Sequence, residues 1–334
     1  MTTRVGINGF GRIGRSYLRA VLASNADIDV VAINDITNVE TLASLLEWDS
    51  ISGHLDGVSA SANEITVQGH TIKVFSQRDP AQIPWGEVGA DIVIESTGLF
   101  TNADAASAHL KGGAKKVIIS APAKGDVPAI VLGVNTDTID VNSSDVFSNG
   151  SCTTNCLAPM AKVLNDTFGI ETGFMNTVHA YTSDQRLHDA PHSDLRRARA
   201  AALSTIPTSS GAASTIGKII PELAGKLTGF ALRVPVPVGS ITDFTAVLNR
   251  ETTTEEVNAA FREAAASSEM SRYLAYSEAP IVSSDIVGNP HSVIFDAPLT
   301  QVIGNHVKVL GWYDNEWGFS NRLVELSELI SRRI

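Results

Sequence analysis

Cysteine is scarce in this 334-residue chain, which contains two, Cys152 and Cys156. They stand four positions apart, so the chain has no set of cysteines that could form a disulfide framework. Free thiols of this kind are typical of a reducing compartment. The N-terminus also lacks an apolar signal region, and no apolar run reaches membrane-spanning length. The sequence therefore predicts a cytoplasmic protein without a membrane partner.

Positive charge is also in short supply. Lys and Arg number 25 against 36 Asp and Glu, which gives a formal net charge of -11. This balance argues against nucleic-acid binding by bulk electrostatics, and we expect no nucleic-acid partner. His188 and His192 stand four apart, as helical zinc ligands do, but Pro191 interrupts a helix there and no Glu follows His188. We expect no metal site.

The chain is long and apolar enough for two domains, with 334 residues of which 43% are hydrophobic. In residues 1–150, short apolar strands alternate with helical stretches. Strands without polar alternation, lying between helices, indicate a parallel sheet covered on both faces. The predicted strands include 4–8, 29–34, 91–96, 116–120 and 129–134. We expect residues 1–150 to form an α/β domain of the Rossmann type.

A glycine-rich turn follows the first predicted strand and opens a helix. It reads Gly9-Phe10-Gly11-Arg12-Ile13-Gly14, and Asp35 ends the next strand 21 positions after Gly14. Such glycines allow the backbone to approach a pyrophosphate, whose charge the helix N-terminus accepts. Asp35 can accept hydrogen bonds from ribose hydroxyls and repels a 2′-phosphate. The motif predicts NAD binding, with NAD preferred over NADP.

The second half changes character after residue 150. Longer alternating strands predict an α+β catalytic domain over residues 151–315, with a mostly antiparallel sheet. Residues 182–204 form a long, irregular, Arg-rich segment, and such loops are usually functional or lie at subunit contacts. We expect the last helix, over 316–334, to return and pack on the first domain.

Cys152 stands at the expected first turn of a helix, after Gly150 and among the hydroxyls of Ser151 and Thr153. The positive end of the helix dipole favours a thiolate there, which predicts a nucleophile. The alternative is a small buried hydrophobic residue, as most intracellular cysteines are. Spacing alone leaves both readings open, because a nucleophilic cysteine also needs a base.

The chain resembles phosphorylating glyceraldehyde-3-phosphate dehydrogenases over about residues 5–321. The motifs that carry the resemblance are specific, and they occupy residues 6–15, 151–159, 179–182, 194–201 and 312–318. The resemblance implies that His179 pairs with Cys152 as general base. It also implies the reaction: NAD-dependent oxidation of D-glyceraldehyde 3-phosphate through a cysteine thioester, which inorganic phosphate attacks to give 1,3-bisphosphoglycerate in glycolysis or gluconeogenesis. Because members of this family are homotetramers, the resemblance also implies self as a partner, and we expect a homotetramer.

The same resemblance implies roles for two further groups of residues. It implies that NAD is bound by the glycine turn, with Gly9 and Gly11, and by Arg12, Ile13, Asp35, Arg78, Ser120 and Asn315. The substrate phosphate and the attacking phosphate are implied to bind among Ser151, Thr153, Thr182, Arg197, Ser210, Gly211 and Arg233. Guanidinium groups, hydroxyls and backbone N–H groups are the donors that phosphate recognition requires.

Two alternatives remain at this point. An erythrose-4-phosphate dehydrogenase has the same Cys and His but hydrolyses its thioester, and residues for a second phosphate argue against it. A catalytically silent NAD-binding redox sensor would use the same fold with an oxidisable Cys152. Intact His179 and Arg233 argue against the sensor.

Overall fold

The computed structural model describes residues 2–332, which fold into two compact units. The first unit takes the described residues of 1–130, 137–150 and 320–334, and the second takes Val131–Thr136 and Ser151–Phe319. The helix expected over 316–334 is α8 (Trp317–Ser331). Residues 333 and 334 of that prediction lie outside the described part of the chain.

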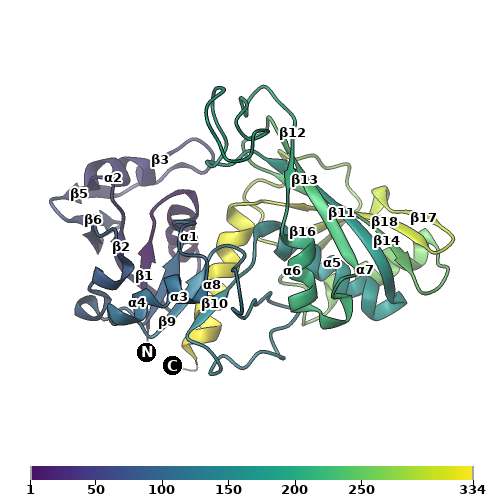
Figure 1. Cartoon of the computed structure of the whole chain (residues 1–334), viewed down its shortest axis with the longest axis horizontal. Coiled ribbons are helices and arrows are strands. Elements are labelled where there is room, and N and C mark those ends of the chain that lie inside the picture. Colours follow the sequence, from purple (N-terminus) through teal and green to yellow (C-terminus); the bar gives the residue numbers. More distant parts are fainter. Residues whose placement is uncertain (1, 333–334) are drawn as a thin grey trace. The chain divides into compact units, whose positions relative to one another are not determined.

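An eight-stranded sheet forms the core of the first unit, in the order β10-β9-β8-β1-β2-β7-β6-β5. Its first six strands pair in parallel, and β6 and β5 add an antiparallel edge. The strands are β1 (Thr3–Asn8), β2 (Ile28–Asn34), β5 (Val58–Ser61), β6 (Glu64–Val67), β7 (His70–Phe75), β8 (Ile92–Glu95), β9 (Lys116–Ile119) and β10 (Val146–Ser148). The predicted Rossmann-type α/β class is confirmed (Figure 1).

Helices cover this sheet, because β1, β8 and β9 are buried along nearly their whole length. The helices are α1 (Arg12–Ala23), α2 (Val39–Glu47), α3 (Ala103–Ala106), α4 (Ala108–Lys111) and α8, with 3-10 turns at Pro80–Gln82 and Trp85–Val88 and a small hairpin of β3 (Trp48–Asp49) and β4 (Gly53–His54). α1 and α8 meet where the Tyr17 hydroxyl lies 3.1 Å from Ser327 Oγ. The strand expected over 129–134 is wrong, since only Ala129 makes an isolated bridge there.

The second unit is built on a second eight-stranded sheet, in the order β12-β13-β11-β14-β18-β16-β15, with β17 paired to β18. The pairs β11–β13 and β15–β16 are parallel and the others antiparallel, which confirms the predicted mostly antiparallel sheet. The strands are β11 (Ile170–Ala180), β12 (Ile206–Ser209), β13 (Leu227–Val234), β14 (Ser240–Leu248), β15 (Leu274–Ser277), β16 (Val293–Asp296), β17 (Gln301–Ile303) and β18 (His306–Tyr313).

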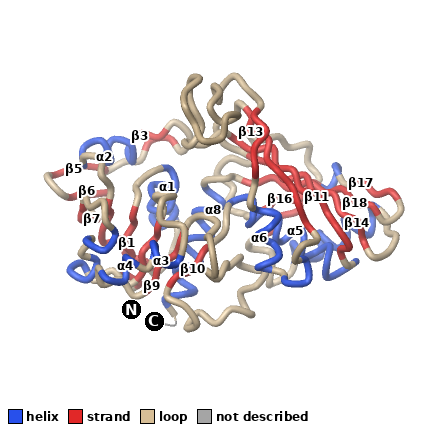
Figure 2. The backbone as a smooth tube through the Cα atoms, in the orientation of Figure 1, coloured by secondary structure: helices blue, strands red, loops and turns tan. Residues whose placement is uncertain are grey.

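One face of this sheet is covered by helices (Figure 2). Along β14 and β18 buried residues alternate with partly exposed ones, the period expected of strands with one covered face. α5 contacts β14, β16 and β18, while α6 contacts β13 and α7 contacts β15. The helices are α5 (Cys152–Phe168), α6 (Ala212–Ile219) and α7 (Thr254–Ala266), with 3-10 turns at Pro221–Leu223 and Ala297–Leu299.

Between β11 and β12, residues 181–205 contain no helix or strand, as expected for the Arg-rich segment. Turns and one isolated bridge, Arg186 to Ala200, give this segment its shape. In Figure 1 this segment belongs to the green loops drawn next to β12. Over residues 2–332, every helix is too short or too polar to cross a bilayer.

Candidate active site

Cys152 is the first residue of α5, and the chain reaches it through a sharp turn. Gly150, two positions earlier, has φ of +66°, a left-handed conformation that favours glycine. Ser151 then caps the helix, because its side chain accepts a hydrogen bond from the Thr154 backbone N–H at 3.0 Å. The cap fixes the first turn, so the helix end sets the position of the Cys152 sulfur.

His179 is the partner of that sulfur. It is the penultimate residue of β11, its imidazole is buried, and Nε2 lies 3.4 Å from Cys152 Sγ. The two residues are 27 positions apart, so only the packing of α5 against the sheet of the second unit brings them together. Their roles as nucleophile and base stay predictions, but the contact that those roles require is present.

Arg233 lies beside His179, because the two residues are partners in the parallel β11–β13 ladder. Arg233 Nη1 lies 3.0 Å from Thr182 Oγ1, 3.1 Å from the Ala180 carbonyl oxygen and 2.9 Å from His179 Nδ1. In the tautomer with its hydrogen on Nδ1, His179 donates to the Ala180 carbonyl oxygen at 2.7 Å. This tautomer leaves Nε2 as the acceptor for the thiol proton.

Burial and the charge of Arg233 decide the ionisation of the pair. Burial raises the pKa of the Cys152 thiol, and Arg233 and the Thr153 backbone N–H offset this only in part. Burial and Arg233 lower the pKa of His179 to about 3. Both shifts favour the neutral form, the thiol of Cys152 and the neutral imidazole of His179. The helix end acts to lower the thiol pKa, as expected, but the loss of solvation outweighs it, so the expected preference for the thiolate is wrong.

A chain of buried hydroxyls supports the pair from behind. Tyr313 Oη lies 2.8 Å from Thr153 Oγ1 and 2.7 Å from Thr177 Oγ1, and Thr177 donates to the Ile241 carbonyl at 3.2 Å. The Tyr313 ring packs edge-on against the His179 ring, with centroids 5.9 Å apart. Burial raises the pKa of Tyr313, so its hydroxyl stays protonated. Sequence reasoning missed this contact, although Tyr313 lies in one of the motifs.

The seven predicted phosphate-binding residues all belong to the second unit, and they are Ser151, Thr153, Thr182, Arg197, Ser210, Gly211 and Arg233. Ser151 is the N-cap of α5 and Thr153 lies in its first turn, while Gly211 is the N-cap of α6, which contacts α5. Ser210 Oγ accepts a local hydrogen bond from Ala212 N at 3.3 Å. Arg233 Nε is buried without a hydrogen-bond partner among residues 2–332. A buried N–H of this kind fits an anionic ligand.

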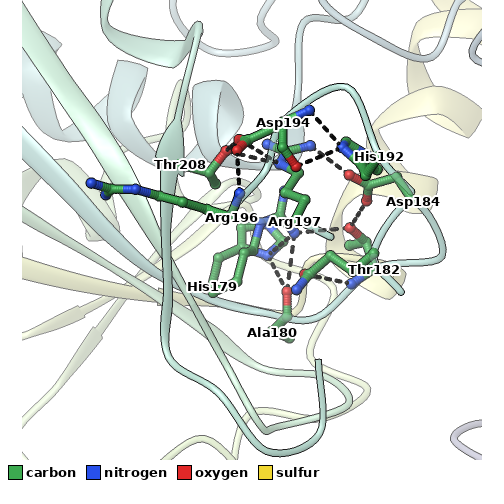
Figure 3. A network of polar contacts seen from close by, with 11 residues as sticks. His179, Ala180, Thr182, Asp184, His192, Asp194, Arg196, Arg197 and Thr208 are labelled. Atoms are coloured by element: carbon green, nitrogen blue, oxygen red, sulfur yellow. Dashed lines mark hydrogen bonds and ion pairs between the residues drawn. The ribbon is translucent and has the colours of Figure 1, made fainter. Parts of the chain in front are cut away.

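Arg197 is held by groups that the sequence did not indicate (Figure 3). Its Nε donates to Thr208 Oγ1 at 2.8 Å, and that hydroxyl donates to Asp194 at 2.7 Å. Its Nη1 donates to Asp184 at 2.5 Å, and the other oxygen of Asp184 accepts from the Thr182 hydroxyl. The predicted phosphate ligands Arg197 and Thr182 thus share a carboxylate of the chain itself.

In the first unit, the glycine turn forms an open cradle at the start of α1. Gly9 has φ of +92°, and a Cβ there would lie 2.7 Å from Thr97 N. A Cβ on Gly14 would lie 2.3 Å from the Gly9 carbonyl oxygen, whereas a Cβ on Gly11 would meet nothing within 4 Å. Gly11 is the N-cap of α1 and offers no side-chain cap. Open space before an uncapped helix end fits the pyrophosphate of NAD.

Asp35 lies at the end of β2, next to this turn. Its Oδ2 accepts from Phe10 N at 2.8 Å and its Oδ1 from Thr37 N at 2.9 Å, which orients the carboxylate beside the cradle. β1 has β2 on one side and β8 on the other, and dinucleotides bind at such a reversal of strand order. These residues fit the adenosine half of NAD.

The other predicted cofactor-binding residues lie in both units, four in the first and Asn315 in the second. Arg12 and Ile13 begin α1, with Arg12 paired to Asp49, while Arg78 is exposed after β7. Ser120 follows β9 and donates its N–H to the Glu95 carbonyl at 3.0 Å. Asn315 belongs to the second unit, where its Oδ1 accepts from Gly239 N and from Ser240 Oγ, both at 3.1 Å. Two donors on Oδ1 fix the orientation of its amide.

Comparisons with known proteins point to the same family along the whole chain. Residues 3–103 match the NAD binding domain of glyceraldehyde 3-phosphate dehydrogenase, and residues 151–315 match its C-terminal domain. Glyceraldehyde-3-phosphate dehydrogenase 1 of Streptomyces avermitilis is 58% identical over 331 residues, 99% of each chain. The glyceraldehyde-3-phosphate dehydrogenases of Streptomyces coelicolor and Mycobacterium avium are each 58% identical, over 100% of each chain. Full-length kinship and the contact of Cys152 with His179 lead to one conclusion: the chain belongs to the glyceraldehyde-3-phosphate dehydrogenase family.

Proposed function

We propose that this chain catalyses the NAD-dependent oxidative phosphorylation of D-glyceraldehyde 3-phosphate to 1,3-bisphosphoglycerate, in glycolysis or gluconeogenesis. The observation that carries the proposal is the 3.4 Å contact of Cys152 Sγ with His179 Nε2, beside the Arg233 guanidinium. A thiol, a base and a fixed cation are what an aldehyde oxidation through a thioester needs. We propose residues 1–150, with the last helix, as the NAD-binding domain and residues 151–315 as the catalytic domain.

Cys152 acts first in the proposed mechanism. His179 Nε2 takes the thiol proton as the sulfur adds to the aldehyde carbon, and then gives that proton to the resulting oxyanion, which leaves a neutral hemithioacetal and a neutral imidazole. The first N–H groups of α5 have no intrahelical acceptor, so the Cys152 N–H can donate to the oxygen that becomes negative. The charge that develops there also stabilises the imidazolium, which raises the pKa of His179 during the reaction.

Oxidation and phosphate attack complete the cycle. NAD, when bound, supplies the hydride acceptor for the aldehyde-derived C–H bond. His179 Nε2 removes the hydroxyl proton of the hemithioacetal, and a Cys152 thioester remains. Oxygen of inorganic phosphate then attacks the thioester carbon, the C–S bond breaks, and the thiolate takes its proton back from His179. Arg197 and Arg233 bind the phosphate groups of the two substrates in this scheme.

Self-association into a homotetramer is part of the proposal. Phe174 and Phe230 are 68% and 49% exposed on the face of the second sheet that lies opposite its helices. Phe230 on β13 is the ladder partner of Asn176 on β11. Phe174 stands two residues before Asn176, on the same face of the sheet, so the two phenylalanines are near neighbours. An exposed apolar surface on a sheet fits a second copy of the chain. Two free cysteines support a cytoplasmic location.

The test is phosphate-dependent formation of NADH by the purified protein. We expect initial rates with D-glyceraldehyde 3-phosphate to require inorganic phosphate and to be higher with NAD than with NADP, because Asp35 repels a 2′-phosphate. Erythrose 4-phosphate as the aldehyde should be oxidised more slowly. Faster, phosphate-independent oxidation of erythrose 4-phosphate, or NAD binding without turnover, would contradict the proposal.

Cys152→Ser should abolish turnover and leave NAD binding measurable. A serine hydroxyl beside His179 loses its proton far less readily than a thiol does, so the addition step fails. Cys156→Ser is the matched control, because Cys156 is buried and lies 3.5 Å from the Gly311 carbonyl rather than at the helix end. Activity retained by Cys152→Ser in a rapid-mixing assay would remove Cys152 from the nucleophile's role.

A further inference from the structure

Asp184 occupies the position between two predicted phosphate ligands. One carboxylate oxygen accepts from Arg197 Nη1 at 2.5 Å, and the other accepts from the Thr182 hydroxyl (Figure 3). That hydroxyl also accepts from Arg233 Nη1 at 3.0 Å. A carboxylate therefore takes the donors that a phosphate oxygen would take.

The guanidinium of Arg197 is bound firmly on its Nε side, whereas the partner of its Nη1 can be replaced. Its Nε side is anchored by Thr208, whose hydroxyl is in turn bonded to Asp194. Its Nη1 side meets Asp184, whose side chain is 41% exposed. If Asp184 left Nη1, the bond from Nε to Thr208 would remain. Arg197 would then keep its position while another acceptor replaced the carboxylate at Nη1.

A tight turn holds Asp184 near Arg197. Gln185 N donates to the Thr182 carbonyl at 2.9 Å, and Gln185 Oε1 accepts from Thr182 N at 3.3 Å. Burial acts to raise the pKa of Asp184, but the Thr182 hydroxyl, Arg197 and Arg233 outweigh it and hold that pKa below its usual range. The carboxylate is therefore ionised near neutral pH, and phosphate meets a charged competitor.

We propose that Asp184 is a built-in competitor of phosphate, which holds Arg197 and Thr182 until a phosphate displaces it. The inference rests on the proposed function, because that function makes Arg197 and Thr182 phosphate ligands. A carboxylate and a phosphate dianion cannot share Nη1 without strong repulsion, so Asp184 must turn toward solvent when phosphate binds. The exposure of its side chain allows this movement.

The competitor lowers the apparent affinity for phosphate. Only the fraction of molecules in which Asp184 has left Arg197 can bind, and the apparent dissociation constant rises by the inverse of that fraction. For a partly exposed ion pair of ordinary strength, this factor is about three to six. Asp184→Asn keeps the shape of the side chain and removes its charge, so it should bind phosphate about three- to sixfold more tightly.

Asp189→Asn is the matched control, because it removes the same charge from the same loop. Asp189 pairs with Arg199 at 2.9 Å, and both side chains are more than half exposed. Long-range electrostatics would change phosphate binding equally in both variants, whereas competition at Arg197 changes it in Asp184→Asn alone. Asp184→Ala should act in the same direction as Asp184→Asn, and thermal unfolding of each variant checks its fold.

Equilibrium titration of the full-length, NAD-loaded protein measures binding without turnover. The probes are inorganic phosphate and glycerol 3-phosphate, which stand for the attacking phosphate and the substrate's phosphate. Tighter binding of at least one probe by Asp184→Asn, with Asp189→Asn like the wild type, supports the inference. Unchanged or weaker binding of both probes, or equal gains in both variants, overturns it. Absence of phosphate-dependent turnover in the wild type would instead contradict the proposed function.

Discussion

Burial favours the neutral form of His179 beside Cys152, and this determines how the site responds to pH. The pKa of His179 is lowered to about 3 by burial and by Arg233, whereas a histidine in the unfolded chain titrates near ~6.5. Between these values the unfolded chain binds a proton that the folded chain does not. The free energy of unfolding therefore falls as the pH falls through this window.

His179→Gln should remove this dependence. Between pH 7 and about pH 4.5, the wild type should lose about 2–3 kcal/mol more of its free energy of unfolding than the variant. Denaturant unfolding at the two pH values measures the difference. His188→Gln, which removes an exposed imidazole of the 181–205 segment, is the control and should behave like the wild type. Equal losses in the wild type and His179→Gln would show that His179 is not buried in its neutral form.

Arg233 tunes the reactivity of the sulfur, since its charge acts to lower the pKa of Cys152. Arg233→Leu should therefore raise the pH midpoint of Cys152 alkylation by iodoacetamide, by about half a unit or more. The measurement needs neither substrate nor NAD. Arg199→Leu removes an exposed guanidinium paired with Asp189 and should leave the midpoint in place. A midpoint unchanged or lower in Arg233→Leu would contradict the electrostatic role of this residue.

At the scale of elements, the helices α1 and α5 begin in opposite ways. Ser151 caps α5 with its side chain and fixes the position of Cys152. Gly11 leaves the first turn of α1 without a side-chain cap. The backbone N–H groups of an uncapped helix end are available to a ligand's phosphate. One helix end thus positions a reacting side chain, and the other is shaped for an anion.

Two alanine substitutions at the start of α1 separate the open space that a ligand needs from the close backbone packing that the fold needs. Gly11→Ala meets no atom within 4 Å and should leave thermal stability near that of the wild type, while its methyl group fills the cradle and weakens NAD binding about tenfold or more. Gly14→Ala places a Cβ 2.3 Å from the Gly9 carbonyl oxygen and should lower stability as well. Calorimetric titration and thermal unfolding give the two readouts. Wild-type NAD affinity in Gly11→Ala would exclude the cradle as the pyrophosphate site.

At the scale of the whole molecule, the second sheet has one face covered by helices and another that exposes Phe174 and Phe230. Phe174→Glu should reduce the size of the assembly, because a charge cannot be buried in an apolar interface without a partner. Light scattering after size-exclusion chromatography measures the mass. Leu45→Glu, a similar change on an exposed residue of α2, is the control. A monomeric wild type, or a tetrameric Phe174→Glu, would contradict the proposed interface.

Much of the fold could be predicted because its signals are local. The glycine turn, the strands around it and the helix at Cys152 are each encoded by residues adjacent in sequence. The strand expected over 129–134 failed for the opposite reason, since apolar residues mark burial but do not specify a ladder partner. The expected preference for the Cys152 thiolate also failed, because burial raises the thiol pKa and burial depends on the packing of the whole unit.

The sequence by itself determined which residue types stand at each turn, helix end and motif, and therefore the class of fold and the chemistry available to it. Only the tertiary structure decided that His179 lies against Cys152, that Tyr313 supports them and that Asp184 holds Arg197. Contacts between residues far apart in sequence depend on strand register and on helix packing. These arise from the burial of many side chains together, and no short motif encodes them.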